Sequence, residues 1–242
     1  MRKLLIAILL ASSLYGQSRF FNDAADIASA ASGVTVPTTK GTISLWVYPT
    51  TAANDSAVHG FVSVGDAAGE SFEIFKGGDN NLYGGWYTLA SGDRREAATA
   101  TWTQNDWNTI TYTWAVATGT SSLLVNGSSL GGFIDDGASR FATSGYNFRI
   151  GSYRGLGLYS AAARIAHVVI WNDVLNGGEI SALANRTPPW TIRPGNRTSW
   201  WPVDGVRATE PDYSTTRATL TTITGGAQAG GPPILFGYSS GR

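Results

Sequence analysis

The sequence has 242 residues, which is enough for one all-β domain, and only 14% of them are charged. Lysine plus arginine and aspartate plus glutamate balance at 17 each, so no strong field would attract nucleic acid or an anionic membrane. There is no cysteine, which excludes disulfides, thiolate metal sites and a cysteine nucleophile.

The N-terminus has the pattern of a secretory signal peptide. A short positive segment, Met1-Arg2-Lys3, precedes an apolar run over residues 4–11 that is too short to span a bilayer, and small residues follow. We predict a signal peptide over residues 1–16, cleaved after Gly16, and hence a secreted or surface-located protein. The alternative is a hydrophobic strand or packing arm that stays on the chain. No other stretch is suited to cross a membrane.

Beyond this segment the sequence has the period of β-strands almost throughout. Residues 43–48 have large apolar or aromatic side chains on both faces, so this strand is expected to lie between two layers. In residues 107–114 the residues Ile, Tyr and Trp alternate with threonines, which predicts one buried and one hydrated face. Turn residues such as Asn126-Gly127 separate the runs at short intervals. The pattern predicts a sandwich or barrel and excludes a parallel α/β sheet.

One short helical turn is predicted after these strands. Asn176 can cap it, and Glu179 can reach back to the amide of Asn176 in a capping-box arrangement. Ile180 and Leu183 then point to the same side. A single turn of this kind would pack on the sandwich.

From about residue 206 the composition shifts to Gly, Thr and Pro. One edge strand is expected within residues 219–224. The segment 225–242 reads as an arm with a single apolar patch, and it carries too little apolar surface to fold alone. It either stays in solvent or is ordered by something against which it lies.

Five pieces of the chain occur in an order typical of one family: an opening strand with an acidic turn, a second strand, a central hairpin in two pieces, and a closing strand with a helical turn. They lie at residues 20–26, 42–49, 107–114, 123–127 and 165–183. Together they resemble the laminin-G-like, or concanavalin A-like, jelly-roll superfamily, in particular its pentraxin-related bacterial and phage branch.

The resemblance covers roughly residues 19–186. It implies an all-β fold, a two-sheet antiparallel jelly-roll sandwich with one convex and one concave sheet and with ligand-binding loops at the rim. We therefore expect this jelly roll over residues 17–205, with one short helical turn, and a C-terminal extension or arm over residues 206–242. Members of the superfamily bind glycans or proteins, some hydrolyse polysaccharides, and many hold Ca²⁺ at the rim.

Hydrolysis is disfavoured by the arrangement of acidic residues. Retaining polysaccharide hydrolases of this superfamily carry a Glu-x-Asp-x-x-Glu strand, whose alternation brings the carboxylates into one groove, and this pattern is missing here. Glu70 and Glu73 would lie on opposite faces of a strand. The two histidines do not suggest a triad either, because His167 is expected to be a satisfied core histidine and His59 to lie on a loop. We therefore predict that the protein is not an enzyme.

Calcium is the one cofactor that the resemblance suggests. Ca²⁺ binds six to eight hard oxygens, and Asn22, Asp23 and Asp26 cluster in the acidic turn that matches the family's. Asp26 is the first choice of ligand. The family usually adds an Asp from the closing strand, and the matching segment here, residues 165–168, lacks a carboxylate. The alternative is a plain polar turn.

A glycan site needs exposed aromatic faces with polar groups beside them. The candidates are Tyr83, Trp86, Tyr87, Tyr153 and Arg154, which lie next to glycines that would leave room for a ligand. The alternative for each aromatic residue is a place in the core between the sheets.

The function favoured by these patterns is a non-catalytic extracellular or surface recognition module for a glycan or surface polysaccharide, acting in binding or adhesion. The alternative is a structural subunit, such as a virion decoration protein or a filament subunit. That subunit would self-associate through the C-terminal arm by adding a strand to a neighbouring sheet.

Overall fold

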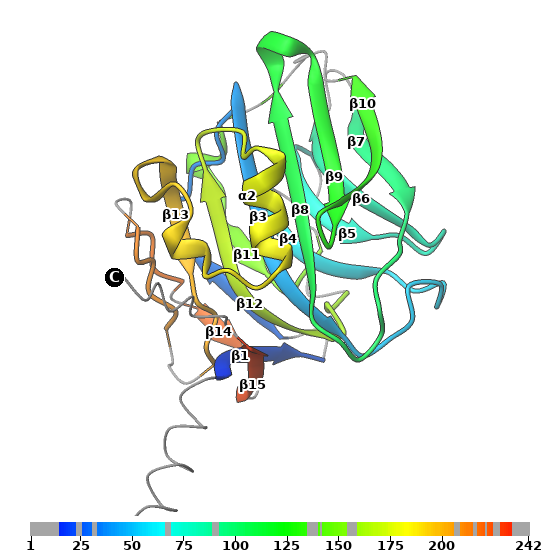
Figure 1. Ribbon diagram of the computed structural model, residues 1–242, viewed down its shortest axis with the longest axis vertical. Coiled ribbons are helices and arrows are strands. Elements are labelled where there is room, and N and C mark those ends of the chain that lie inside the picture. The colour runs from blue at the N-terminus through cyan, green and yellow to red at the C-terminus, as the bar shows by residue number, and fades with distance from the viewer. Residues whose placement is uncertain are drawn as a thin grey trace, which may run out of the picture.

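The structure is a computed structural model in which two antiparallel sheets pack face to face (Figure 1). This architecture confirms the predicted two-sheet jelly-roll sandwich. Among the described residues no helix is both long and apolar enough to cross a membrane. The structure describes residues 15–22, 26–30, 33–65, 69–88, 92–134, 140, 142–153, 159–205, 209–214, 217–220, 222–224 and 228–233.

The first sheet contains eight strands in the described part of the chain. Seven follow one another in the order β10 (Ser128–Ile134), β9 (Thr120–Val125), β8 (Asn108–Ala115), β3 (Lys40–Pro49), β12 (Ala163–Trp171), β1 (Tyr15–Phe21) and β15 (Gln228–Pro233). The eighth, β13 (Arg197–Trp201), pairs with β12.

The second sheet contains seven described strands. Their order is β14 (Thr222–Thr224), β2 (Ile27–Ala30), β11 (Phe148–Ile150), β4 (His59–Gly65), β5 (Ser71–Lys76), β6 (Asn81–Thr88) and β7 (Gly92–Thr99). Short 3-10 helices occur at Val116–Thr118, Thr143–Gly145, Pro189–Thr191 and Pro194–Asn196.

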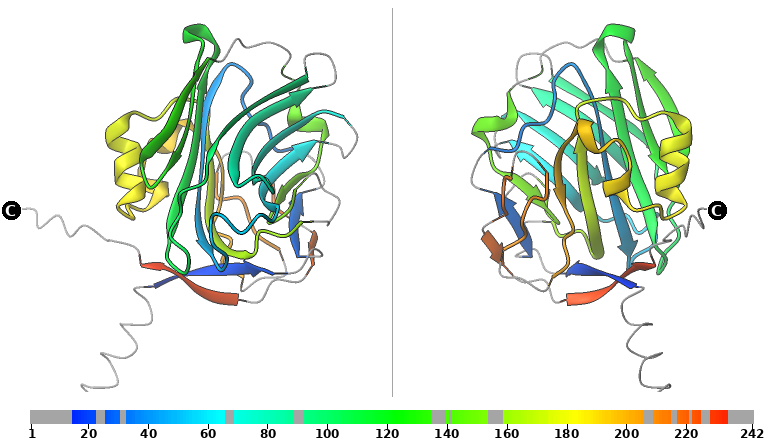
Figure 2. Two further views of the ribbon diagram at one scale, coloured as in Figure 1. Left: turned by 90° about the vertical axis from the view of Figure 1, so that its right-hand side faces the viewer. Right: turned by 60° about the vertical axis from the view of Figure 1, so that its left-hand side comes forward.

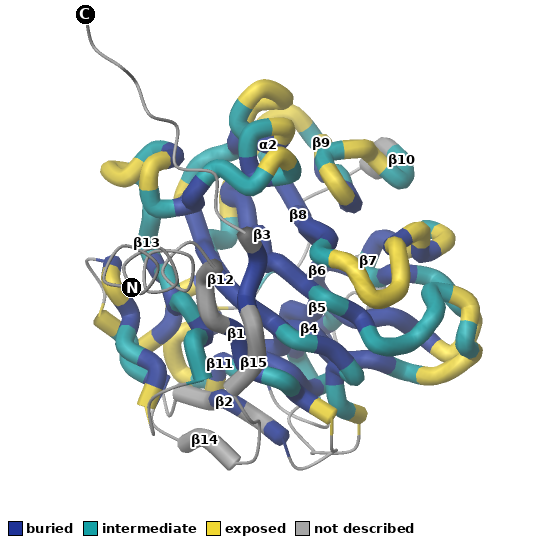
Figure 3. Tube along the Cα trace, turned by 60° about the horizontal axis from the view of Figure 1, so that its bottom comes forward, coloured by how far each residue is buried: buried dark blue, intermediate teal, exposed yellow. Residues whose placement is uncertain are grey.

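The core lies between the sheets and is built from alternate residues of each strand. Ile43, Leu45 and Val47 of β3 face Phe72 and Ile74 of β5 within one large buried cluster. The burial of both faces of β3 confirms that this strand lies between two layers. The tube in Figure 3 shows buried strand centres in dark blue and exposed turns at the periphery in yellow.

A second layer covers the outer face of the first sheet. The helix α2 (Gly177–Ala184) begins with the predicted capping box between Asn176 and Glu179, and Figure 2 shows it against this sheet. Ile180 and Leu183 pack in a smaller apolar cluster with Trp171. The threonine face of β8 is buried rather than hydrated, so that expectation was wrong. The sequence of a strand does not reveal what packs over it.

The C-terminal segment adds a strand to each sheet. Thr222–Thr224 forms the edge strand β14, as expected, whereas residues 228–233 form β15 and pair with β1 (Figure 2). Glu210 is buried and its carboxylate lies 3.3 Å from Nη2 of Arg19 on β1. Part of the segment predicted to be an arm is thus joined to the sandwich by backbone pairing. Residues 234–242 lie outside the described residues, as do residues 1–14 of the predicted signal peptide.

Candidate functional site

The outer face of the second sheet collects aromatic and charged side chains. Strand alternation separates the two faces of β6: Leu82 and Trp86 point into the core, and Tyr83 and Tyr87 point outward. The core residues Phe72 and Ile74 likewise place Glu73 and Phe75 on the outward face of β5. Outward residues of β5, β6 and β7 therefore form one continuous surface.

Arg95 crosses this surface to reach Glu73. In the register of the sheet Arg95 on β7 lies opposite Gly85 on β6, and Gly85 lies opposite Glu73 on β5. Because Gly85 has no side chain, the arginine can extend over it, and its Nη1 lies 2.8 Å from Oε2 of Glu73. Both side chains are almost fully buried. Breaking a buried pair is costly, so this ion pair should hold the guanidinium in place.

Four aromatic rings surround the Arg95 guanidinium. Its central carbon lies 5.0 Å from the ring centroid of Phe75, 5.7 Å from that of Tyr83 and 5.5 Å from that of Tyr87. Nη1 also donates a hydrogen bond to the hydroxyl of Tyr153 at 3.3 Å. At these distances the cation is attracted to the ring faces, which fixes rings and cation relative to one another.

The rings also stack on one another. Phe75 and Tyr83 are nearly parallel, with centroids 4.7 Å apart, and Tyr153 lies 4.3 Å from Phe75. Tyr159 continues the row at 5.9 Å from Tyr153 and is 41% exposed. The row therefore runs from the buried guanidinium out to solvent.

These groups line a cavity of about 340 Å³. Its size lies within the range of small-molecule sites in proteins. We call this cavity the Arg95 site. Its lining consists of Val58, Phe75, Gly77, Gly78, Asp79, Tyr83, Arg95, Tyr153 and Tyr159.

Asp79 supplies a carboxylate at the edge of the Arg95 site. The Tyr83 hydroxyl donates a hydrogen bond of 2.6 Å to Oδ2 of Asp79. This bond raises the pKa of Tyr83 and holds the pKa of the Asp79 carboxyl below its ordinary value. Asp79 is therefore an ionised acceptor at neutral pH, and Tyr83 keeps its proton.

A buried ion cluster supports the loops behind the cavity. Lys76 is fully buried and donates to Oδ1 of Asp55 at 2.6 Å and to the carbonyl of Ala57 at 2.8 Å. His59 Nε2 lies 2.6 Å from Oδ2 of Asp55. Burial alone would raise the pKa of Asp55, but the bonds from Lys76, Ala57 and His59 bring it well below its ordinary value. The segment that carries Val58 is thus fixed against β5.

The structure brings together three of the five residues proposed from sequence for glycan binding. Tyr83, Tyr87 and Tyr153 all contact Arg95. Trp86 is 2% exposed and packs edge-on against Phe72 in the core, so its assignment to a ligand site was wrong. Arg154 lies outside the described residues.

Sequence reasoning missed Arg95, Phe75, Asp79 and Tyr159. The sequence alone could have shown that Trp86 is a core residue. Trp86 lies an even number of residues from the apolar Leu82, so both side chains point to the same face of the strand. Arg95 gave no local signal, since its position depends on the register of three strands.

The predicted calcium turn is only partly described. Oδ2 of the buried Asp26 accepts a hydrogen bond of 2.9 Å from the amide of Asn22, which is how a polar turn closes on itself. Asp23 lies outside the described residues. Within the described ranges no group of three or more His, Cys, Asp and Glu side chains is placed to hold a metal. Because Asp23 lies outside these ranges, the calcium site stays a prediction.

His167 is buried, as expected, but it lies on the outer face of its sheet. A bulge in β12 gives His167 a φ of 51° and turns its ring toward Trp46, with centroids 5.0 Å apart. Neither ring nitrogen has a hydrogen-bond partner among the described residues, so it is not a satisfied core histidine. Burial lowers its pKa to about 4. His59, expected on a loop, is the first residue of β4.

Comparison with known proteins agrees with this architecture. Among solved structures, a Bacteroides ovatus ATCC 8483 protein, provisionally described as carbohydrate binding, superposes with a TM-score of 0.62 at 14% identity. The match covers 91% of this chain and 62% of that one. The SAP-like pentraxin of Limulus polyphemus gives a TM-score of 0.46 at 16% identity, covering 67% of this chain and 83% of the pentraxin.

The binding domain of botulinum neurotoxin serotype G gives a TM-score of 0.47 at 16% identity, covering 65% of this chain and 37% of that one. At 14% identity the likeness to the Bacteroides ovatus protein concerns the fold alone. No curated protein matches the sequence. The model of the family described as "Concanavalin A-like lectin/glucanases superfamily" matches residues 22–181, about two thirds of the chain. The chain belongs to the concanavalin A-like lectin/glucanase superfamily.

Proposed function

We propose that this protein is a non-catalytic recognition module, extracellular or on the surface of a cell or virion, and that it binds carbohydrate in the Arg95 site. Sugars present C–H faces that pack on aromatic rings and paired hydroxyls that bond to charged groups. The site offers both, with the rings of Tyr153 and Tyr159 beside the guanidinium of Arg95 and the carboxylate of Asp79. The observation that carries the proposal is this row of rings fixed around a buried cation.

The state of the carboxylates supports binding rather than hydrolysis. A retaining glycosidase needs two carboxyl groups about 5–5.5 Å apart, one as nucleophile and one as acid. Here the Glu73 carboxylate is buried beneath Arg95 in an ion pair, and Asp79 accepts a hydrogen bond from Tyr83. Glu73 is therefore unavailable as the second catalytic carboxyl group that hydrolysis beside Asp79 would need.

A structural subunit is the weaker hypothesis. It relied on a free arm after residue 225, whereas residues 228–233 pair with β1 of the same chain. Self-association would have to use residues 234–242 or another surface. We therefore rank recognition of a surface polysaccharide first.

The test is a glycan array followed by calorimetric titration of the strongest hit. Tyr159→Ala removes an exposed ring from the Arg95 site without touching the core, and it should weaken binding on the order of tenfold, as loss of an aromatic anchor often does. The matched control is Tyr48→Ala, because Tyr48 is a partly exposed tyrosine on the outer face of the other sheet and lies outside this site.

An equal loss of affinity in the two variants, or none in Tyr159→Ala, would contradict the proposal. So would hydrolysis of the bound glycan, seen as new reducing ends after long incubation. Unchanged circular dichroism and melting temperature for both variants would show that the comparison concerns binding and not folding.

A further inference from the structure

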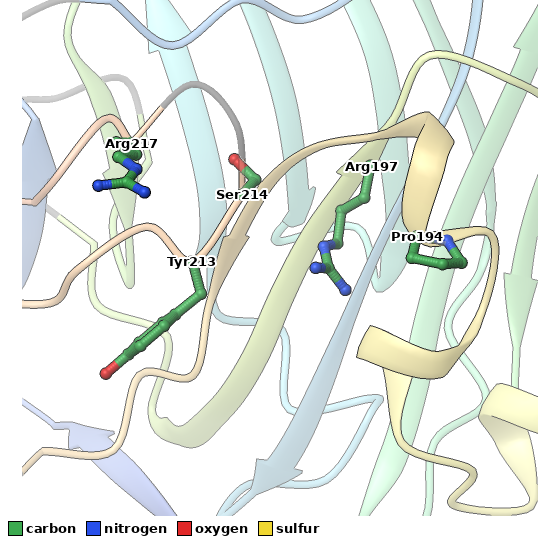
Figure 4. Close-up of a pocket in the computed structure, with 5 residues that line it drawn as sticks. All are labelled: Pro194, Arg197, Tyr213, Ser214 and Arg217. Carbon is green, nitrogen blue, oxygen red and sulfur yellow. The ribbon is translucent and has the colours of Figure 1, made fainter.

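A second cavity lies on the other side of the sandwich. It has a volume of about 370 Å³ and is built entirely from the chain beyond the family match, which ends at residue 181. Trp201 of β13 points into the core, so its neighbour Trp200 lies on the outer face of the first sheet, and Tyr213 packs on Trp200 at 5.3 Å. Figure 4 shows the residues that line this cavity, Pro194, Arg197, Tyr213, Ser214 and Arg217, and we call it the Arg197 site.

The lining of the Arg197 site is cationic. Among the described residues it contains Arg197 and Arg217 and no carboxylate. Asp212 is close enough to affect Arg197, but its oxygens accept hydrogen bonds from the backbone amides of Trp200, Ser214 and Ala218. Among the described residues, Asp212 is thus the negative charge that acts on Arg197, and backbone amides already bond to its carboxylate.

Arg197 retains unused hydrogen-bonding capacity. Its Nη1 donates to the carbonyl of Trp190 at 3.0 Å, while its buried Nε has no partner among the described residues. Burial lowers the pKa of Arg197, although the guanidinium stays charged at neutral pH. An anionic ligand in the cavity would therefore meet a charged guanidinium.

An aromatic surface and a hydroxyl adjoin the two cations. Arg197 lies over the ring of Trp200 at 5.0 Å, and Tyr213, which packs on the same indole, is 47% exposed. The Ser214 hydroxyl, which also lines the cavity, donates to the carbonyl of Thr198. Figure 4 shows the Arg197 side chain extending toward the side on which Tyr213 lies.

We propose that the Arg197 site is a second binding site, specific for a sugar unit that carries a carboxylate. The planar guanidinium of an arginine matches a carboxylate with two parallel hydrogen bonds. The pyranose face would pack on the exposed ring of Tyr213. The ligand class differs from that of the Arg95 site, where the cation is already neutralised by Glu73.

The experiment is calorimetric titration of the whole protein with three probes that share one neutral disaccharide core. These are 3′-sialyllactose, 3′-sulfated lactose and lactose, with a galacturonate trisaccharide as a second carboxylate probe. Arg217→Gln should weaken binding of the carboxylate probes on the order of tenfold, since hydrogen bonds to charged groups are worth that much. Arg217 is exposed, so its loss should leave the fold unchanged.

Arg197→Gln should weaken binding at least as much, and its melting temperature must be checked because Arg197 also bonds to Trp190. The control is Arg186→Gln, which removes the same charge at a partly exposed residue 3.7 Å from Asp106. Equal effects of Arg217→Gln and Arg186→Gln would overturn the proposal by showing unspecific attraction. Failure of both carboxylate probes to bind, or tighter binding of the sulfated probe, would also overturn it.

The proposals for the Arg95 site and the Arg197 site can be refuted independently. Tyr159→Ala should leave binding of the carboxylate probes unchanged, because Tyr159 lines the Arg95 site and is not among the described residues that line the Arg197 site. If it abolishes their binding, the acidic sugar occupies the Arg95 site and the Arg197 proposal falls. If Arg217→Gln acts as expected while no neutral glycan binds anywhere, the Arg95 proposal falls and this one stands.

Discussion

The buried His167 predicts a specific dependence of stability on pH. Its ring is enclosed by Trp46, Trp190 and Trp200, with centroids 5.0, 5.6 and 6.4 Å away. Burial lowers its pKa from 6.5 to about 4, so the folded protein keeps it neutral where the unfolded chain protonates it. Stability from this group is full above pH 6.5 and is lost as the pH falls from 6.5 toward 4.

The magnitude follows from the difference between the two pKa values. One pKa unit corresponds to about 1.4 kcal/mol, so the whole step is on the order of 3 kcal/mol. Within the window the free energy of unfolding should fall by up to about 1.4 kcal/mol per pH unit. Glu210 acts in the opposite sense, because burial raises its pKa and its ionisation with rising pH destabilises the fold.

The contribution of His167 can be separated from that of Glu210 by comparing the wild type with a variant that lacks the histidine. Denaturant unfolding of the wild type and of His167→Phe, at several pH values from 7.5 to 4, gives two curves in which the contribution of Glu210 cancels. The Phe ring keeps the contacts with the tryptophans but cannot titrate. Between pH 6.5 and 4 the wild type should lose about 3 kcal/mol of stability relative to His167→Phe, whatever the offset of the two curves at neutral pH. Parallel curves would refute the conclusion that His167 is buried and neutral.

Three further predictions concern the ion pair, the acidic turn and the C-terminus. Arg95→Gln should lower the free energy of unfolding by about 3 kcal/mol in denaturant, because it leaves the Glu73 charge buried without its partner. Adding Glu73→Gln should recover part of that loss, and the absence of any recovery would argue against the ion pair. Asp26→Ala should lower the melting temperature equally in CaCl₂ and in EGTA if the carboxylate only closes its turn, whereas a loss confined to CaCl₂ would place the ion there. Deleting residues 225–242 should destabilise the domain because β15 is lost, whereas deleting 234–242 should not, and scanning calorimetry with light scattering compares the two.

Much of the fold follows from local patterns in the sequence. The alternation of Ile43, Leu45 and Val47 already marks a strand between two layers, and the structure buries its whole central part. The spacing of Asn176 and Glu179 predicts a capping box, and both of its hydrogen bonds are present. Such features depend on residues within one turn or one strand, so they can be predicted without knowledge of the tertiary structure.

Features set by strand register could not be predicted in this way. Arg95 meets Glu73 only because Gly85 lies between them across three strands, a relation between residues 22 apart. The bulge in β12 likewise reverses the face of His167, and no simple period contains a bulge. The strand β15 was missed because its Gly and Pro content disfavours a strand and its pairing partner is at the other end of the chain.

The most direct test of carbohydrate binding in the Arg95 site is fluorine NMR on protein labelled with 3-fluorotyrosine. Each resonance is assigned by a single Tyr→Phe variant, and the strongest array hit is titrated in. The account predicts that the signals of Tyr83, Tyr153 and Tyr159 shift together with one dissociation constant, while that of Tyr48, on the outer face of the other sheet, stays fixed. Shifts confined to tyrosines outside this cavity would contradict it.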